Sequence, residues 1–252
     1  MIRLENVFLT LGDSPILKDI SFSIEKGETG VMLGASGSGK TTILRIILGL
    51  YRPDSGRVFV NGEDITGLGE EELYKVRKKM GMVFQGGALF DSLTVGENVG
   101  YRLKESGMDD DDIEACVRKS LRFVGLEDSI DQMPAELSGG MKKRVAIARG
   151  IASSPKILLY DEPTAGLDPI NAHNITMLIN KLKVEEGVAS VVVTHDIPAA
   201  FSVASKIAFI DEGNLVYVGD KDGLTTSGDE RVRKFLNHSG FLTGNQVNEC
   251  RP

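Results

Sequence analysis

Apolar and polar positions along the chain follow two periods, and their order predicts an α/β protein. Strict alternation at Ile20–Ile24 is the pattern of a half-buried strand. Near-continuous apolar runs at Thr29–Leu33 and Val188–Val193 are typical of strands buried on both faces, as in parallel sheets. We expect further strands at 2–9, 57–60, 80–84, 156–160, 206–210 and 215–218.

Helical spacing of apolar residues occupies the segments between these strands. We expect helices at 40–50, 70–79, 109–124, 141–152, 171–186 and 229–236. Strand patterns are absent from residues 86–155, which indicates a helical subdomain inserted into the core. The predicted parts are 1–85 (core with a β subdomain), 86–155 (helical subdomain), 156–227 (core, second part) and 228–252 (C-terminal helix and polar tail).

A glycine-rich loop separates the predicted strand 29–33 from the helix that follows it. Its sequence fits the phosphate-loop pattern G-x-x-x-x-G-K-[ST]. In such a loop successive N–H groups point at phosphate oxygens, and the helix N-terminus adds its positive dipole end. We expect Lys40 to contact the β- and γ-phosphates of ATP and the Thr41 hydroxyl to contact Mg²⁺. The nucleotide-binding residues are Gly34, Ala35, Ser36, Gly37, Ser38, Gly39, Lys40, Thr41 and Thr42.

Two carboxylates follow the buried-type strand 156–160. Asp161 ends the strand, where its carboxylate can hold Mg²⁺, and Glu162 comes next. A carboxylate at this position can act as general base toward the attacking water. Together with the phosphate loop, the pair predicts an ATP-hydrolysing site. Tyr160, just before it, is bulkier than the aliphatic residue usual there.

Composition limits the partners. The chain has 252 residues and a net charge of −7, so it repels a phosphate backbone and nucleic acid is not an expected partner. The apolar runs are well short of the ~20 residues that span a bilayer. We therefore expect a cytoplasmic protein whose membrane role comes through a partner.

The segment Leu137–Met141, Leu-Ser-Gly-Gly-Met, lies ahead of Asp161 and resembles the signature motif of ABC ATPases. The resemblance extends from Ile2 to about Gly223 and implies a RecA-like P-loop core with an antiparallel β subdomain and a helical subdomain. It also implies that two copies close around two ATP molecules. In that arrangement Ser138, Gly139, Gly140 and Met141 of one copy face the nucleotide of the other.

Three more positions match elements of the same family. Gln85 matches the glutamine that binds Mg²⁺ and water and senses the membrane partner. Asp168 matches the loop at the dimer seam, and His195 matches the histidine that contacts the γ-phosphate. Leu11 occupies the place where the family commonly stacks an aromatic side chain on adenine, which implies an aliphatic contact. His173 and His238 match nothing and are expected at the surface.

Three features are similar to the ATPases of Mla/MCE-type lipid transporters, namely Gln85–Phe90, Met141 in place of the usual Gln, and Asp229–Leu236. This resemblance implies phospholipid transport at the cytoplasmic face of the bacterial inner membrane. The implied partners are a membrane permease, an MCE lipid-binding protein and a small STAS-domain subunit. The alternative is a small-solute importer, for example for amino acids.

Other classes fit less well. ABC ATPases of DNA repair carry long insertions and those of translation usually carry two cassettes, and neither feature is present. The helix at 229–236 leaves two interpretations open. Its apolar stripe either crosses to a second copy or packs on its own domain.

Overall fold

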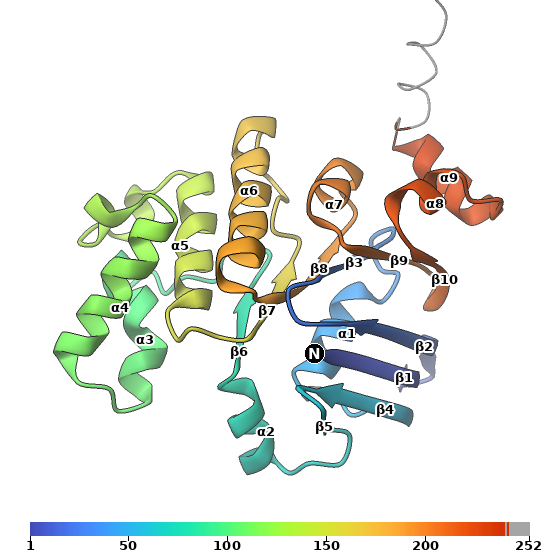
Figure 1. Cartoon of the computed structure of the whole chain (residues 1–252), viewed down its shortest axis with the longest axis horizontal. Coiled ribbons are helices and arrows are strands. Elements are labelled where there is room, and N and C mark those ends of the chain that lie inside the picture. Colours follow the sequence, from blue (N-terminus) through green and yellow to red (C-terminus); the bar gives the residue numbers. More distant parts are fainter. Residues whose placement is uncertain (240, 242–252) are drawn as a thin grey trace, which may run out of the picture.

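A mixed β-sheet runs through the computed structural model, which describes residues 1–239 and 241 (Figure 1). The strand order is β5-β4-β1-β2-β10-β9-β3-β8-β7-β6. The strands are β1 (Ile2–Leu11), β2 (Ser14–Ile24), β3 (Thr29–Leu33), β4 (Ser55–Val60), β5 (Glu63–Asp64), β6 (Met80–Val83), β7 (Ile157–Asp161), β8 (Ala189–Thr194), β9 (Lys206–Asp211) and β10 (Asn214–Gly219).

The sheet has an antiparallel half and a parallel half. Strands β1, β2, β4 and β5 pair antiparallel, whereas β9, β3, β8, β7 and β6 pair parallel. β10 joins the halves, antiparallel to β9 and parallel to β2. Alternate residues of β3 enter two different cores, Val31 and Leu33 in one and Met32 in the other. Both faces of the parallel half are therefore covered, as its continuous apolar runs require.

Helices cover the sheet and extend beyond one end of it (Figure 1). They are α1 (Lys40–Ile47), α2 (Glu70–Arg77), α3 (Val95–Glu105), α4 (Asp110–Phe123), α5 (Gly139–Ile151), α6 (Pro169–Glu186), α7 (Ile197–Val203), α8 (Lys221–Thr225) and α9 (Glu230–His238). α3, α4 and α5 stand together on the β6 side, and α8 and α9 lie at the β10 side. No helix within residues 1–239 and 241 could span a bilayer.

The predicted fold class is confirmed, and the differences concern element ends and the helices α3, α7 and α8, which the patterns did not predict. α1 ends at Ile47 and not at residue 50, because Gly49 adopts φ +64° and Leu50 N–H donates to Arg45 O at 2.8 Å. This is the left-handed glycine ending of a helix. α3 was not predicted, although Thr94 and Glu97 form a capping box there. The part boundaries at 85, 155 and 227 stay a prediction.

Two hairpins connect neighbouring strands of the sheet, and their turn conformations explain the residues found in them. Asn61-Gly62 joins β4 to β5, with φ +53° and +83°, and Glu212-Gly213 joins β9 to β10, with φ +46° and +77°. Positive φ at both central residues matches the right-handed strand twist.

The C-terminal helix packs on its own domain. Val232 and Leu236 of α9 are fully buried, and the Phe235 ring centre lies 5.0 Å from that of Phe209 in β9. This contact supports the second of the two interpretations of the apolar stripe. The polar tail predicted to follow lies mostly outside the described residues.

Candidate functional site

The glycine-rich loop after β3 has a backbone shape that needs glycine. Gly37 and Gly39 adopt φ +81° and +103°, in the left-handed region where other residues are strained. A Cβ on Gly34 would lie 2.2 Å from the carbonyl oxygen of Ile210. The loop therefore lies tightly against β9, and its curl is set by these three positions.

Lys40, the first residue of α1, is held inside this loop. Its Nζ donates to Gly34 O at 2.8 Å and to Ala35 O at 2.7 Å, and the residue is 5% exposed. Burial lowers the pKa of Lys40, while the nearby carboxylates Glu162 and Asp161 act in the opposite direction. The result is a desolvated cation fixed among backbone groups, suited to an anionic phosphate.

Thr41 and Asp161 bring two hard oxygen donors together. Thr41 Oγ1 donates to Asp161 Oδ1 at 3.0 Å. Burial raises the pKa of Asp161, and the Thr41 hydrogen bond partly offsets this. Hydroxyl and carboxylate oxygens suit Mg²⁺, which is usually bound by one or two carboxylates plus substrate phosphates and water. Residues 1–239 and 241 contain no group of three His, Cys, Asp or Glu side chains arranged for a metal.

Glu162 is held by hydrogen bonds from the neighbouring strand. It follows β7 with φ +47°, and its N–H donates to Val193 O at 2.9 Å. Oε2 accepts from Thr194 Oγ1 at 3.1 Å, and Oε1 lies 3.0 Å from His195 Nδ1. The Glu162 side chain is 12% exposed and that of His195 is 59% exposed. A carboxylate fixed in a left-handed backbone and open on one side is placed to accept a proton from water.

These groups surround one open cavity of about 630 Å³, the phosphate cavity. Its wall combines the loop residues Ala35 to Thr42, except Ser38, with Gln85, Glu162 and His195. The structure therefore brings together five predicted residues from different parts of the chain, Lys40, Thr41, Gln85, Glu162 and His195.

The predicted residues of the signature segment, and Asp168, do not line this cavity in the described chain. Ser138 caps α5, with Met141 N–H donating to its Oγ at 3.2 Å, and Asp168 caps α6 through Ile170 and Asn171. Neither Asp168 nor any residue from Ser138 to Met141 lines the phosphate cavity of the described chain.

Lys143 is a buried residue of this region that sequence reasoning missed. It is 6% exposed, and its Nζ donates to Glu162 O at 3.1 Å and also to Gln85 O. Burial lowers its pKa, with Glu162 and Asp161 opposing. Because Lys142, Lys143 and Arg144 are consecutive, the sequence looks like a solvated basic run, and only the phase of α5 identifies the buried member.

The far wall of the phosphate cavity also differs from expectation. Ile16, Phe235, His238 and Ser239 line it. His238 is exposed, as predicted, but faces this cavity. Leu11 is 40% exposed and is not among the lining residues of the described chain, whereas Ile16 is, and the expected adenine contact stays a prediction.

Comparison with known proteins agrees with this geometry. A family model described as ABC transporter matches residues 17–165. The intermembrane phospholipid transport system ATP-binding protein MlaF of Escherichia coli K12 is 39% identical over 94% of this chain and 88% of MlaF. The methionine import ATP-binding protein MetN 1 of Listeria monocytogenes is 41% identical over 81% of this chain and 60% of MetN 1.

A solved structure gives the same result. The ATP-binding cassette MJ0796, a dimer in a post-hydrolysis state with ADP and Pi, superposes with a TM-score of 0.79 and 35% identity, over 87% of this chain and 98% of that one. Family model, relatives and fold agree, and the chain belongs to the ABC transporter family as an ATP-binding and ATP-hydrolysing subunit.

Proposed function

We propose that this ATPase subunit drives the transport of phospholipids or related lipids through a membrane permease partner. The observation that carries the proposal is the likeness to MlaF. The matched region covers 88% of MlaF, whereas the match to the methionine import protein MetN 1 covers only 60% of that protein. Met141 in the signature segment and the C-terminal helix α9 favour the same assignment. The alternative is a small-solute importer, because the MetN 1 likeness reaches a similar identity.

We infer the following roles at the phosphate cavity. Lys40 binds the β- and γ-phosphates, and the loop amides from Gly34 to Thr42 orient them. Thr41, Asp161 and Gln85 would hold Mg²⁺, which would supply neutralisation of phosphate charge. The close Thr41–Asp161 pair supports this ligand set.

Glu162 acts as general base toward the attacking water, and His195 contacts the γ-phosphate. The hydrogen bonds from Thr194 and His195 aim the Glu162 carboxylate and support this role. Lys143 is a positioning residue, because it joins the backbone carbonyls of Gln85 and Glu162.

A second copy completes each site in this proposal. Ser138, Gly139, Gly140 and Met141 of one copy cover the nucleotide bound to the other, and Asp168 lies at the seam between them. In the described chain none of these residues lines its own phosphate cavity, which is consistent with a head-to-tail pair. The pair works at the cytoplasmic face of the inner membrane on a permease, with an MCE protein and a STAS-domain subunit as further partners.

Copurification tests the cargo and the partners. The tagged chain is purified in gentle detergent, and all copurifying proteins and lipids are identified by mass spectrometry. The lipid proposal expects a permease with an MCE protein and enriched phospholipid, relative to a detergent extract from cells without the tag. Recovery of a permease with a solute-binding protein and no lipid enrichment would establish the importer instead.

A further inference from the structure

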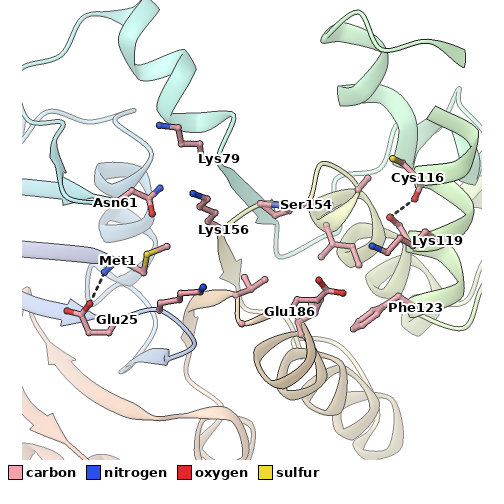
Figure 2. A pocket seen from close by; sticks show the side chains of 18 of the residues that line it. Met1, Glu25, Asn61, Lys79, Cys116, Lys119, Phe123, Ser154, Lys156 and Glu186 are labelled. Carbon is pink, nitrogen blue, oxygen red and sulfur yellow. Dashed lines mark hydrogen bonds and ion pairs between the residues drawn. The ribbon is translucent and has the colours of Figure 1, made fainter. Parts of the chain in front are cut away.

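A second cavity, of about 880 Å³, lies at the opposite edge of the parallel strands (Figure 2). Lys79 precedes β6, Lys156 precedes β7 and Val188 precedes β8, so these lining residues mark the amino ends of the strands. The phosphate cavity lies at their carboxyl ends. Within the described chain the two cavities have no lining residue in common. We call the second one the amino-edge cleft.

The cleft separates the helical group, made of α3, α4 and α5, from the core (Figure 1). Lys119 and Phe123 of α4 line one side, and Lys79 and Lys156 line the other (Figure 2). Its volume lies in the range of about 300–1,000 Å³ found for small-molecule sites. It spans two parts of the fold that are far apart in sequence.

One part of the cleft wall is apolar. Phe123, Ile151, Leu182 and Val188 line it, and Leu182 and Val188 are 1% and 6% exposed. Apolar wall next to open space is the usual lining of a site for an apolar ligand group. These side chains would contact an alkyl or acyl chain rather than a sugar or a free ion.

The rim is cationic. Four exposed lysines line the cleft, Lys26, Lys79, Lys119 and Lys156, against the carboxylates Glu25 and Glu186. Among the described residues none of the four ammonium groups has a carboxylate within ion-pair distance or a side-chain hydrogen bond. This excess of positive charge occurs on a chain of net charge −7, so it marks a local anion-attracting field.

We propose that the amino-edge cleft binds a small amphipathic anion, an alkyl or acyl chain that ends in a phosphate or carboxylate. Lys119 and Lys156, from opposite sides, receive the anionic group as compact point charges. Phe123 and Ile151, the partly exposed members of the apolar wall, contact the chain. A ligand held between α4 and the start of β7 ties the helical group to the core, so its affinity changes with their relative position.

The proposal separates the ligand into two parts that can be tested one at a time. Octyl phosphate, used below its micelle concentration, carries both parts. Inorganic phosphate lacks the chain, octyl glucoside lacks the charge, and butyl phosphate has a shorter chain. Binding to the full nucleotide-free chain is measured by isothermal titration calorimetry at two salt concentrations.

We expect saturable binding of octyl phosphate that weakens at higher salt. Butyl phosphate, inorganic phosphate and octyl glucoside should each bind at least about tenfold more weakly, since each lacks part of the contact. In the double variant Lys119→Glu/Lys156→Glu, affinity for octyl phosphate should fall at least about tenfold. The matched control is Lys75→Glu/Lys221→Glu, which changes net charge equally at exposed lysines outside the cleft. Circular dichroism and Tm verify the fold of both.

Three results would overturn the proposal. One is the absence of saturable binding up to about 1 mM, the weak end of specific affinity. A second is equal binding of octyl phosphate by both double variants. The cleft lysines would then serve only to balance the negative dipole ends at the C-termini of α5 and α6. The third is binding to phosphatidic acid vesicles, but not to monomeric octyl phosphate, lost in Lys119→Glu/Lys156→Glu. That result would make the cleft rim a membrane-surface contact.

Discussion

The two edges of the parallel strands carry lysines in opposite physical states. At the carboxyl edge, Lys40 and Lys143 are 5% and 6% exposed and each donates to two backbone carbonyls. At the amino edge, Lys119 and Lys156 are exposed and line an open cleft. The first pair has its geometry set before any ligand arrives, whereas the second supplies charge without fixed geometry.

This difference separates two uses of the same side chain. A buried, hydrogen-bonded ammonium group loses little freedom when it acts, which suits chemistry that needs placement within tenths of an ångström. An exposed ammonium group keeps its hydration and rotamers, so it attracts anions but selects among them weakly. We therefore expect changes at the carboxyl edge to alter turnover and changes at the amino edge to alter binding of anions other than ATP.

The largest expected effect is at Glu162. Glu162→Gln keeps the size of the side chain and one acceptor oxygen but removes its basicity. ATP hydrolysis should fall by about 10²–10⁴, with ATP affinity nearly unchanged. Steady-state hydrolysis and nucleotide binding by calorimetry measure the two quantities separately, and near-normal turnover in the variant would exclude Glu162 as the base.

A smaller loss is expected at Lys143, whose ammonium group joins the loops of Gln85 and Glu162. Lys143→Met keeps the aliphatic chain but removes this link, so kcat should fall about ten- to a hundredfold while KM for ATP changes far less. Kinetics of hydrolysis under saturating Mg²⁺ measure the split between kcat and KM.

Two matched variants make the Lys143 result specific. Lys143→Arg retains the charge and donors and should recover part of kcat, which a purely steric role would not predict. Lys142→Met, the adjacent residue on α5, should be close to normal. A parallel fall in Tm and kcat in Lys143→Met, with no recovery in Lys143→Arg, would reduce Lys143 to a structural residue.

The parts of the carboxyl edge that could be predicted from sequence are those built from contiguous residues. The loop residues Gly34 to Thr42, and Asp161 with Glu162, are contiguous, and glycine and carboxylate in that order constrain the local backbone directly. Lys143 and the amino-edge cleft depend on tertiary placement. The cleft draws on α4, α5, α6 and the starts of three strands, and no local pattern marks residues that meet only after folding.

Two helix ends have clear local sequence signals. Thr94 and Glu97 mark the start of α3, and Gly49 marks the end of α1, so both ends are predictable from the sequence. Ile16 could not have been chosen over Leu11 for the cavity wall. Both lie beside the β1–β2 turn, and only the path of β2 past Gly39 brings Ile16 to the phosphate loop.

The pH dependence of metal binding tests whether burial of Asp161 matters. Because burial raises its pKa above the ordinary value of 3.8, the carboxylate takes up a proton at a higher pH than usual. Mg²⁺ needs the ionised form, so below the raised pKa its apparent affinity should fall about tenfold per pH unit. Without nucleotide the same shift lowers folding stability as pH rises from 3.8 through the raised pKa, because the folded state binds more protons there.

Magnesium titrations of ATP binding from neutral pH down to the lowest pH at which the protein stays folded measure this dependence. ATP itself takes up protons in that range, and Asp161→Asn provides the correction because the contribution of ATP remains in the variant. The difference between the two proteins should slope toward weaker binding at low pH. Identical slopes would show that Asp161 does not hold the metal.

The smallest expected effect concerns how fast an amine reagent labels the two lysine pairs, Lys40 with Lys143 and Lys119 with Lys156. Burial acts on this rate in two opposite ways. Burial lowers the pKa of Lys40 and Lys143, which increases the fraction of reactive neutral amine. The same burial keeps a reagent away and holds the nitrogen in hydrogen bonds. The labelling rate of a bulky amine reagent depends more on access to the lysine nitrogen than on the basicity of that nitrogen. Lys119 and Lys156 should therefore be labelled several-fold faster than Lys40 and Lys143, as measured by peptide mass spectrometry. Saturating ATP should slow Lys40 further and leave the amino-edge pair unchanged, whereas equal labelling of all four would mean that the carboxyl edge opens freely in solution.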